Sequence, residues 1–119
     1  MAKIALIDDS SATLDMLTSI LQEAGHSVQA LSSGVGAESV LAQDVPNLVL
    51  LDVVMPGRNG YEVLRGLKRQ ASTKNVPIIM VSSKGEETDV RWGMRQGAAD
   101  YVTKPFTTES VLAAVSKQL

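Results

Sequence analysis

Five short apolar runs alternate with longer amphipathic segments along the whole chain, and this alternation limits the possible fold more than any other feature. Short apolar runs that are bounded by polar or turn residues are typical of buried strands, whereas an apolar residue at every third or fourth position is typical of helices. The resulting order βαβαβαβαβα predicts an α/β protein whose parallel sheet is covered on both faces. The expected strands cover residues 3–7, 27–31, 47–51, 78–81 and 99–102.

Glycine and hydroxyl residues mark where the helices begin and end. Ser10 or Ser11 can cap the first helix, which Gly25 ends, and Thr107 or Thr108 can cap the last one. We expect helices over residues 10–24, 33–42, 60–70 and 86–96, and a last helix from residue 107.

The topology follows from the handedness of the connections. Right-handed crossovers between parallel strands favour a doubly wound sheet. We therefore expect a (βα)5 fold of the flavodoxin-like kind with strand order 2-1-3-4-5, an order taken over from known folds rather than derived from the sequence.

Composition limits the classes of function. The 119 residues suit a single domain over residues 1–119, with little room for an attached effector domain. A net charge of −2 argues against direct nucleic-acid binding, and the absence of cysteine excludes disulfides and thiolate chemistry. The opening apolar run, residues 4–7, is too short for a signal peptide or for membrane insertion, so we expect a cytoplasmic protein.

Polar residues follow four of the predicted strands. Asp8 and Asp9 come after the first strand, Asp52 after the third, Ser82 after the fourth and Lys104 after the fifth. Ligands of open α/β sheets bind at the carboxyl ends of the strands, so these side chains are expected to share one pocket. Three carboxylates repel one another there, and oxygen ligands without nearby histidine or cysteine favour Mg²⁺ as the neutralising cation.

Such a pocket is suited to a phosphoryl group. A metal ion and Lys104 can neutralise phosphoryl oxygens, and one carboxylate can act as the nucleophile and form an aspartyl phosphate. Asp52 is the best candidate for the nucleophile, because it ends a middle strand and faces both Asp9 and Lys104.

Four motifs together resemble the CheY-like receiver domain of bacterial response regulators. The motifs are DD at 8–9, DxxMPG at 52–57, SS at 82–83 and YxxKPF at 101–106. The resemblance implies that Asp52 is the phosphoacceptor. It also implies that Asp9, Asp52 and the backbone carbonyl of Val54 bind Mg²⁺, with help from Asp8 through water.

The resemblance assigns further roles near the pocket. It implies that Ser82 hydrogen-bonds the phosphoryl group, that Lys104 pairs with it, and that Tyr101 changes rotamer to report it. A cis peptide bond between Lys104 and Pro105 is also implied. Ser82 stands where threonine is commoner in the family, which keeps the hydroxyl and removes a methyl group.

The family also implies partners. A histidine kinase is the expected phosphodonor, and a downstream protein is expected to dock on the face made by the fourth helix, fifth strand and fifth helix. Residues 86–105 are similar to the stand-alone PilH-type regulators of twitching-motility chemosensory systems. The expected protein is a signalling switch that catalyses only its own phosphorylation and dephosphorylation, rather than an enzyme with an external substrate.

Two other functions stay open from sequence alone. A haloacid-dehalogenase-like phosphatase also uses an aspartate nucleophile with Mg²⁺, but it needs a second acid two residues later, where this chain has Val54. A receiver-like interaction module that no longer uses phosphate is the other possibility, and the acidic and basic residues of the pocket count against it.

Three residues outside the motifs are less informative. His26 is expected to be an exposed loop residue, away from the pocket. Trp92 either packs inward or serves as a docking anchor, and we favour packing inward because that is the more frequent fate of tryptophan. Gly93 lies within a predicted helix, where glycine costs about 1 kcal/mol relative to alanine, and no feature of the sequence explains it.

Overall fold

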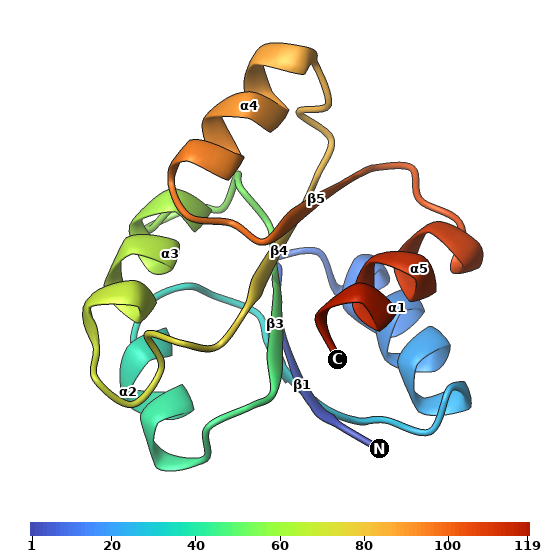
Figure 1. Ribbon diagram of the computed structural model, residues 1–119, viewed down its shortest axis with the longest axis horizontal. Coiled ribbons are helices and arrows are strands. Elements are labelled where there is room, and N and C mark those ends of the chain that lie inside the picture. Colours follow the sequence, from blue (N-terminus) through green and yellow to red (C-terminus); the bar gives the residue numbers. More distant parts are fainter.

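The computed structural model describes residues 1–119 as one five-stranded parallel sheet with five helices (Figure 1). The strands lie in the order β2-β1-β3-β4-β5, which confirms the predicted topology. The strands are β1 (Lys3–Ile7), β2 (Ser27–Leu31), β3 (Leu48–Leu51), β4 (Ile78–Ser82) and β5 (Asp100–Thr103). The helices are α1 (Ser11–Glu23), α2 (Ala37–Gln43), α3 (Gly60–Arg69), α4 (Glu87–Arg95) and α5 (Thr108–Gln118).

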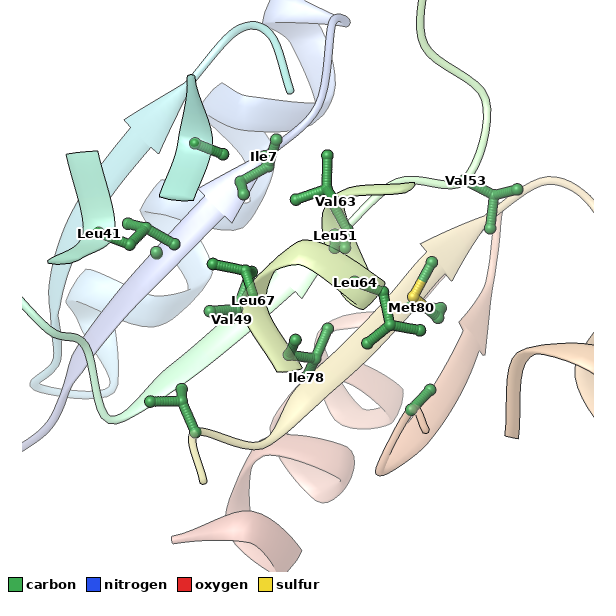
Figure 2. Packing of buried hydrophobic residues seen from close by; sticks show 14 of the residues in the cluster. Ile7, Leu41, Val49, Leu51, Val53, Val63, Leu64, Leu67, Ile78 and Met80 are labelled. Atoms are coloured by element: carbon green, nitrogen blue, oxygen red, sulfur yellow. The ribbon is translucent and has the colours of Figure 1, made fainter. Parts of the chain in front are cut away.

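The sheet separates two apolar layers. Helices α1 and α5 cover one face, and α2, α3 and α4 lie on the other (Figure 1). Successive residues of a strand point to opposite faces, so Ile78 belongs to the cluster of 15 buried residues beneath α2 and α3, whereas Ile79 belongs to the cluster of 13 beneath α1 and α5. Figure 2 shows the larger cluster, in which Leu64 and Leu67 of α3 lie over Val49 and Ile78. No helix is long and apolar enough to cross a lipid bilayer.

Side-chain caps fix where three helices begin. The Ser10 hydroxyl accepts a hydrogen bond from the Thr13 amide at 3.2 Å at the start of α1. Asn59 and Glu62 cap each other's backbone amides at the start of α3, and Thr107 and Ser110 do the same at α5. These caps satisfy amides that have no partner in the first helical turn. Of the two candidates predicted for each helix, Ser10 caps α1 and Thr107 caps α5.

The second helix is shorter than predicted. Helix α2 begins at Ala37, so the expected start at residue 33 was wrong, and Val35 is a loop residue that is 66% exposed. Gly36 has a φ of 77°, a left-handed conformation that ends any helix running through it. The Ser33 hydroxyl accepts the Val35 amide at 3.1 Å, a local bond that competes with helix formation.

Two predictions about single residues were also wrong. Trp92 is 50% exposed instead of buried, and its ring meets that of Tyr61 edge to face with centroids 6.4 Å apart. The position on α4 that does face the sheet is taken by Gly93, which is buried. His26 is half-buried rather than exposed, because its Nδ1 accepts a hydrogen bond from the Ala2 amide at 3.1 Å.

Candidate functional site

An acidic cluster lies at the carboxyl ends of β1 and β3. Asp8, Asp9 and Asp52 each offer a carboxylate oxygen, and these oxygens lie within 4.8 Å of one another. The sheet holds two of the three in place, because the Asp52 amide donates to Ile7 at 2.9 Å and the Asp8 amide donates to Leu31 at 3.1 Å. The carboxylates predicted from the strand ends therefore do meet in one pocket.

Lys104 enters the same pocket from the end of β5. Its ammonium lies 2.8 Å from Asp8 Oδ2 and 3.7 Å from Asp52 Oδ2. The Lys104 amide donates to the Ser82 carbonyl at 2.8 Å, which extends the ladder between β4 and β5 by one residue. The peptide bond between Lys104 and Pro105 is cis. One cation thus serves two carboxylates, and the pocket keeps a net negative charge.

The three carboxylates differ in how free their oxygens are. Asp8 is buried, and its two oxygens accept from the Ser10 amide at 2.9 Å and from Lys104. Asp9 is exposed to solvent and open to a cation. Asp52 is 6% exposed, and its Oδ1 accepts from the Val53 amide at 2.8 Å. An oxygen-only set with excess negative charge suits a hard divalent ion such as Mg²⁺.

The electrostatics of Asp52 reflect this crowding. Burial, together with the nearby charge of Asp8, raises the pKa of Asp52 to about 6, although Lys104 and the Val53 amide act to lower it. The ionised form of Asp52 is therefore under-compensated in the chain alone. A divalent cation or a bound group that brings positive charge would relieve this cost.

Ser82 and Tyr101 lie beside the pocket and are connected to each other. The Ser82 hydroxyl is fully buried and accepts from the Lys84 amide at 3.2 Å, while the Tyr101 hydroxyl donates to the Lys84 carbonyl at 2.5 Å. Burial raises the pKa of Tyr101 to about 12, and a hydrogen bond with Ser82 opposes that rise. Both residues therefore hold the loop between β4 and α4.

Val54 differs from the other predicted site residues. Its side chain is 53% exposed and apolar, so it offers no proton to a leaving group. Only its backbone carbonyl could serve a metal ion.

Sequence reasoning missed a link that holds the loop between β3 and α3. Arg58 binds Glu38 of α2 through both terminal nitrogens, one of them 2.6 Å from Oε2, and it also donates to the carbonyls of Gly34 and Glu62 at 3.2 Å. The partners are far apart in the chain, so no local pattern could have indicated them.

Comparison with known proteins identifies the class. The response regulator receiver domain family matches residues 4–116, and the chain therefore belongs to that family. The protein PilH of Pseudomonas aeruginosa is 41% identical over 119 residues, which cover 100% of this chain and 98% of PilH. The phosphate regulon regulator PhoB of Rhizobium meliloti is 38% identical over 117 residues, but this chain spans only 52% of its length.

Solved structures agree with this assignment. The chemotaxis protein CheY4 of Vibrio cholerae has a TM-score of 0.93 and 28% identity, covering 100% of this chain and 99% of CheY4. Receiver domains are signalling proteins that bind Mg²⁺ at an aspartate cluster and interact with a histidine kinase and downstream targets. Nothing in the family assignment supports the phosphatase alternative.

Proposed function

We propose that this receiver domain, residues 1–119, stores a signal as an aspartyl phosphate on Asp52. The observation that carries the proposal is the cluster of three carboxylates within 4.8 Å, with Lys104 reaching two of them. A phosphoryl group adds negative charge to a pocket that is already negative, so it needs cations on several sides.

The chain's own residues can divide this task. Asp52 Oδ2, the oxygen on the Lys104 side, is the nucleophile: it forms a bond to phosphorus as the P–N bond of a phosphohistidine breaks, and the departing imidazole takes a proton. Lys104 is 3.7 Å from that oxygen and can follow the phosphoryl oxygens. The Ser82 hydroxyl can turn from the Lys84 amide to a phosphoryl oxygen.

The residues also fit a resident Mg²⁺. Asp9, Asp52 and the Val54 carbonyl would hold it directly, and Asp8 through water, since both Asp8 oxygens already accept hydrogen bonds. When bound, Mg²⁺ supplies positive charge to the transferring phosphoryl group.

The partners follow from the same proposal. A histidine kinase donates the phosphoryl group, and a downstream protein reads the change on the face formed by α4, β5 and α5. A groove of about 350 Å³ on this face is lined by Tyr101, Thr103, Ser110, Ala113 and Lys117, among other residues. Tyr101 thus belongs both to the loop contact beside Ser82 and to the groove. The full-length similarity to PilH supports a role in a chemosensory phosphorelay.

Acetyl phosphate with Mg²⁺ tests the assignment of Asp52. We expect the intact mass of the wild type to rise by one phosphoryl group, and that of Asp52→Asn to stay unchanged. Asp15→Asn is the matched control, because Asp15 is an exposed aspartate on α1 and should not affect labelling. An equal mass gain in wild type and Asp52→Asn, or none in wild type, would show the assignment to be wrong.

A further inference from the structure

Gly93 lies in the last turn of α4 and is the buried residue of that helix. Glycine is a poor helix former, because it leaves the backbone more freedom in the unfolded chain. A Cβ atom built at this position lies 2.9 Å from Cδ2 and 3.0 Å from Cε2 of Tyr101. The missing side chain therefore makes room for the tyrosine ring.

Tyr61 forms a second side of the same space. Its hydroxyl oxygen is 3.7 Å from the position of a Cβ on Gly93, and its ring contacts Trp92 edge to face at 83°. Helix α3 and helix α4 thus both border the ring of Tyr101. The space exists because one residue of α4 has no side chain while its neighbour Trp92 turns outward.

The position of the Tyr101 ring determines whether its hydroxyl can reach the Lys84 carbonyl, beside the acidic pocket. The Tyr101 hydroxyl donates to the Lys84 carbonyl at 2.5 Å, and the Lys84 amide donates to the buried Ser82 hydroxyl at 3.2 Å. A ring displaced from Gly93 by even a few tenths of an ångström changes the reach of its hydroxyl. Short hydrogen bonds lose strength steeply with such changes in geometry.

We propose that Gly93 is a positioning residue: together with Tyr61 it forms a slot that keeps Tyr101 on Lys84 and so holds the loop between β4 and α4 in place beside Ser82. A methyl group at position 93 closes the slot and shifts Tyr101 toward orientations that leave Lys84 free. The inference rests on the proposed function, in which Tyr101 reports the phosphoryl group on Asp52, but the slot itself exists without phosphate.

A double-mutant cycle of Gly93→Ala and Tyr101→Ala tests the slot in the full chain, without Mg²⁺ or phosphodonor. We expect each single variant to speed hydrogen exchange of the Lys84 amide, by up to about tenfold for the loss of one hydrogen bond. The double variant should exchange no faster, because both changes release the same contact. Arg95→Ala alters an exposed position of α4 and should leave this exchange as in wild type.

Unfolding in urea supplies a second readout. Gly93→Ala should lower the unfolding midpoint in the wild-type background, where the methyl group meets Tyr101. In the Tyr101→Ala background it should raise the midpoint, because only the better helix propensity of alanine remains. If Gly93→Ala alone fails to fold, recovery of folding in the double variant supports the slot.

Several results would overturn the inference: the same midpoint shift in both backgrounds, unchanged Lys84 exchange in Gly93→Ala, or a double variant that fails to fold although Tyr101→Ala folds. These results are separable from the proposed function. An unlabelled Asp52 would refute the phosphoacceptor role and leave the cycle intact, whereas an additive cycle would refute the slot and leave the labelling of Asp52 unaffected.

Discussion

The surroundings of Asp52 favour its neutral, protonated form over the carboxylate. The side chain is 6% exposed, close to Asp8, and only partly compensated by Lys104 at 3.7 Å. A structural aspartate in such a place usually has full hydrogen-bond partners. The Oδ2 atom of Asp52 instead has only the Lys104 ammonium nearby, at 3.7 Å. An oxygen that is free in this way suits a carboxylate that must react or bind a metal ion.

The pKa of Asp52 makes stability depend on pH. The carboxyl titrates at about 6 in the folded protein and near the ordinary value of 3.8 in the unfolded chain. Between these values the folded state binds more protons, so the free energy of unfolding falls as the pH rises through this window. We expect Asp52→Asn, measured by urea unfolding without metal, to be more stable than wild type at about pH 8 by up to about 3 kcal/mol.

The difference should vanish at about pH 4, where Asp52 is protonated in the folded wild type. Asp15→Asn serves as the control, because it removes a carboxylate that is exposed on α1. A stabilisation by Asp52→Asn that is the same at both pH values would contradict the assigned cause.

Among the elements, the loop from β3 to α3 is held by a tie to α2. Arg58 binds the Glu38 carboxylate with two nitrogens, and the two side chains are only 23% and 26% exposed. Planar, two-point pairing of this kind is stronger and more directional than a typical surface ion pair. The tie fixes the segment that follows Asp52 and includes the Val54 carbonyl.

We expect Arg58→Ala to lower the free energy of unfolding by about 1–3 kcal/mol, because Glu38 and the Gly34 carbonyl lose charged donors. Hydrogen exchange in residues 54–59 should rise as well. Arg58→Lys should recover only part of the loss, since lysine cannot pair at two points.

Arg91 supplies the comparison for this measurement. Its pair with Glu87 joins side chains that are 59% and 85% exposed, so Arg91→Ala should change stability by no more than about 0.5 kcal/mol. Equal losses for Arg58→Ala and Arg91→Ala would show that the link to α2 adds nothing beyond a surface ion pair.

The elements also show what the sequence could predict. All five strands were located to within one residue. For β1, β3 and β4 the signal was a continuous apolar run, because burial on both faces leaves a local signature. The edge strands β2 and β5 are only partly buried, and their sequences carry a weaker signal. The loop at residues 33–36 was missed, because it depends on the left-handed Gly36 and a serine turn rather than on periodicity.

In the site, too, some features could be predicted from the sequence and others could not. The cluster of carboxylates could be predicted because the ends of parallel strands meet at one edge, and the structure brings Asp8, Asp9 and Asp52 together there. The contacts of Arg58 with Glu38 and of Gly93 with Tyr101 could not, because each joins side chains of different elements. The burial of Trp92 was mispredicted for the same reason, since Gly93 and the ring of Tyr101 occupy the inward position.

At the scale of the whole molecule, the single sheet contributes residues to two apolar layers, one on each of its faces. The layer under α2 and α3 and the layer under α1 and α5 never meet except through the strands. The pocket lies where the three central strands end, so both layers must be intact to hold Asp8 and Asp52 in place. A shared sheet also predicts that the two layers unfold together.

Adjacent residues of β4 test this prediction, because Ile78 and Ile79 are both fully buried but belong to different layers. We expect Ile78→Val and Ile79→Val each to lower the free energy of unfolding by about 0.5–1.5 kcal/mol, since each deletes one buried methylene. The double variant should lose the sum of the two within about 0.5 kcal/mol, because the side chains share no packing neighbours. Urea unfolding followed by circular dichroism and by Trp92 fluorescence should give one coincident transition in all variants. If one substitution separated the two signals, the layers would be independent folding units, and the sheet would not couple them.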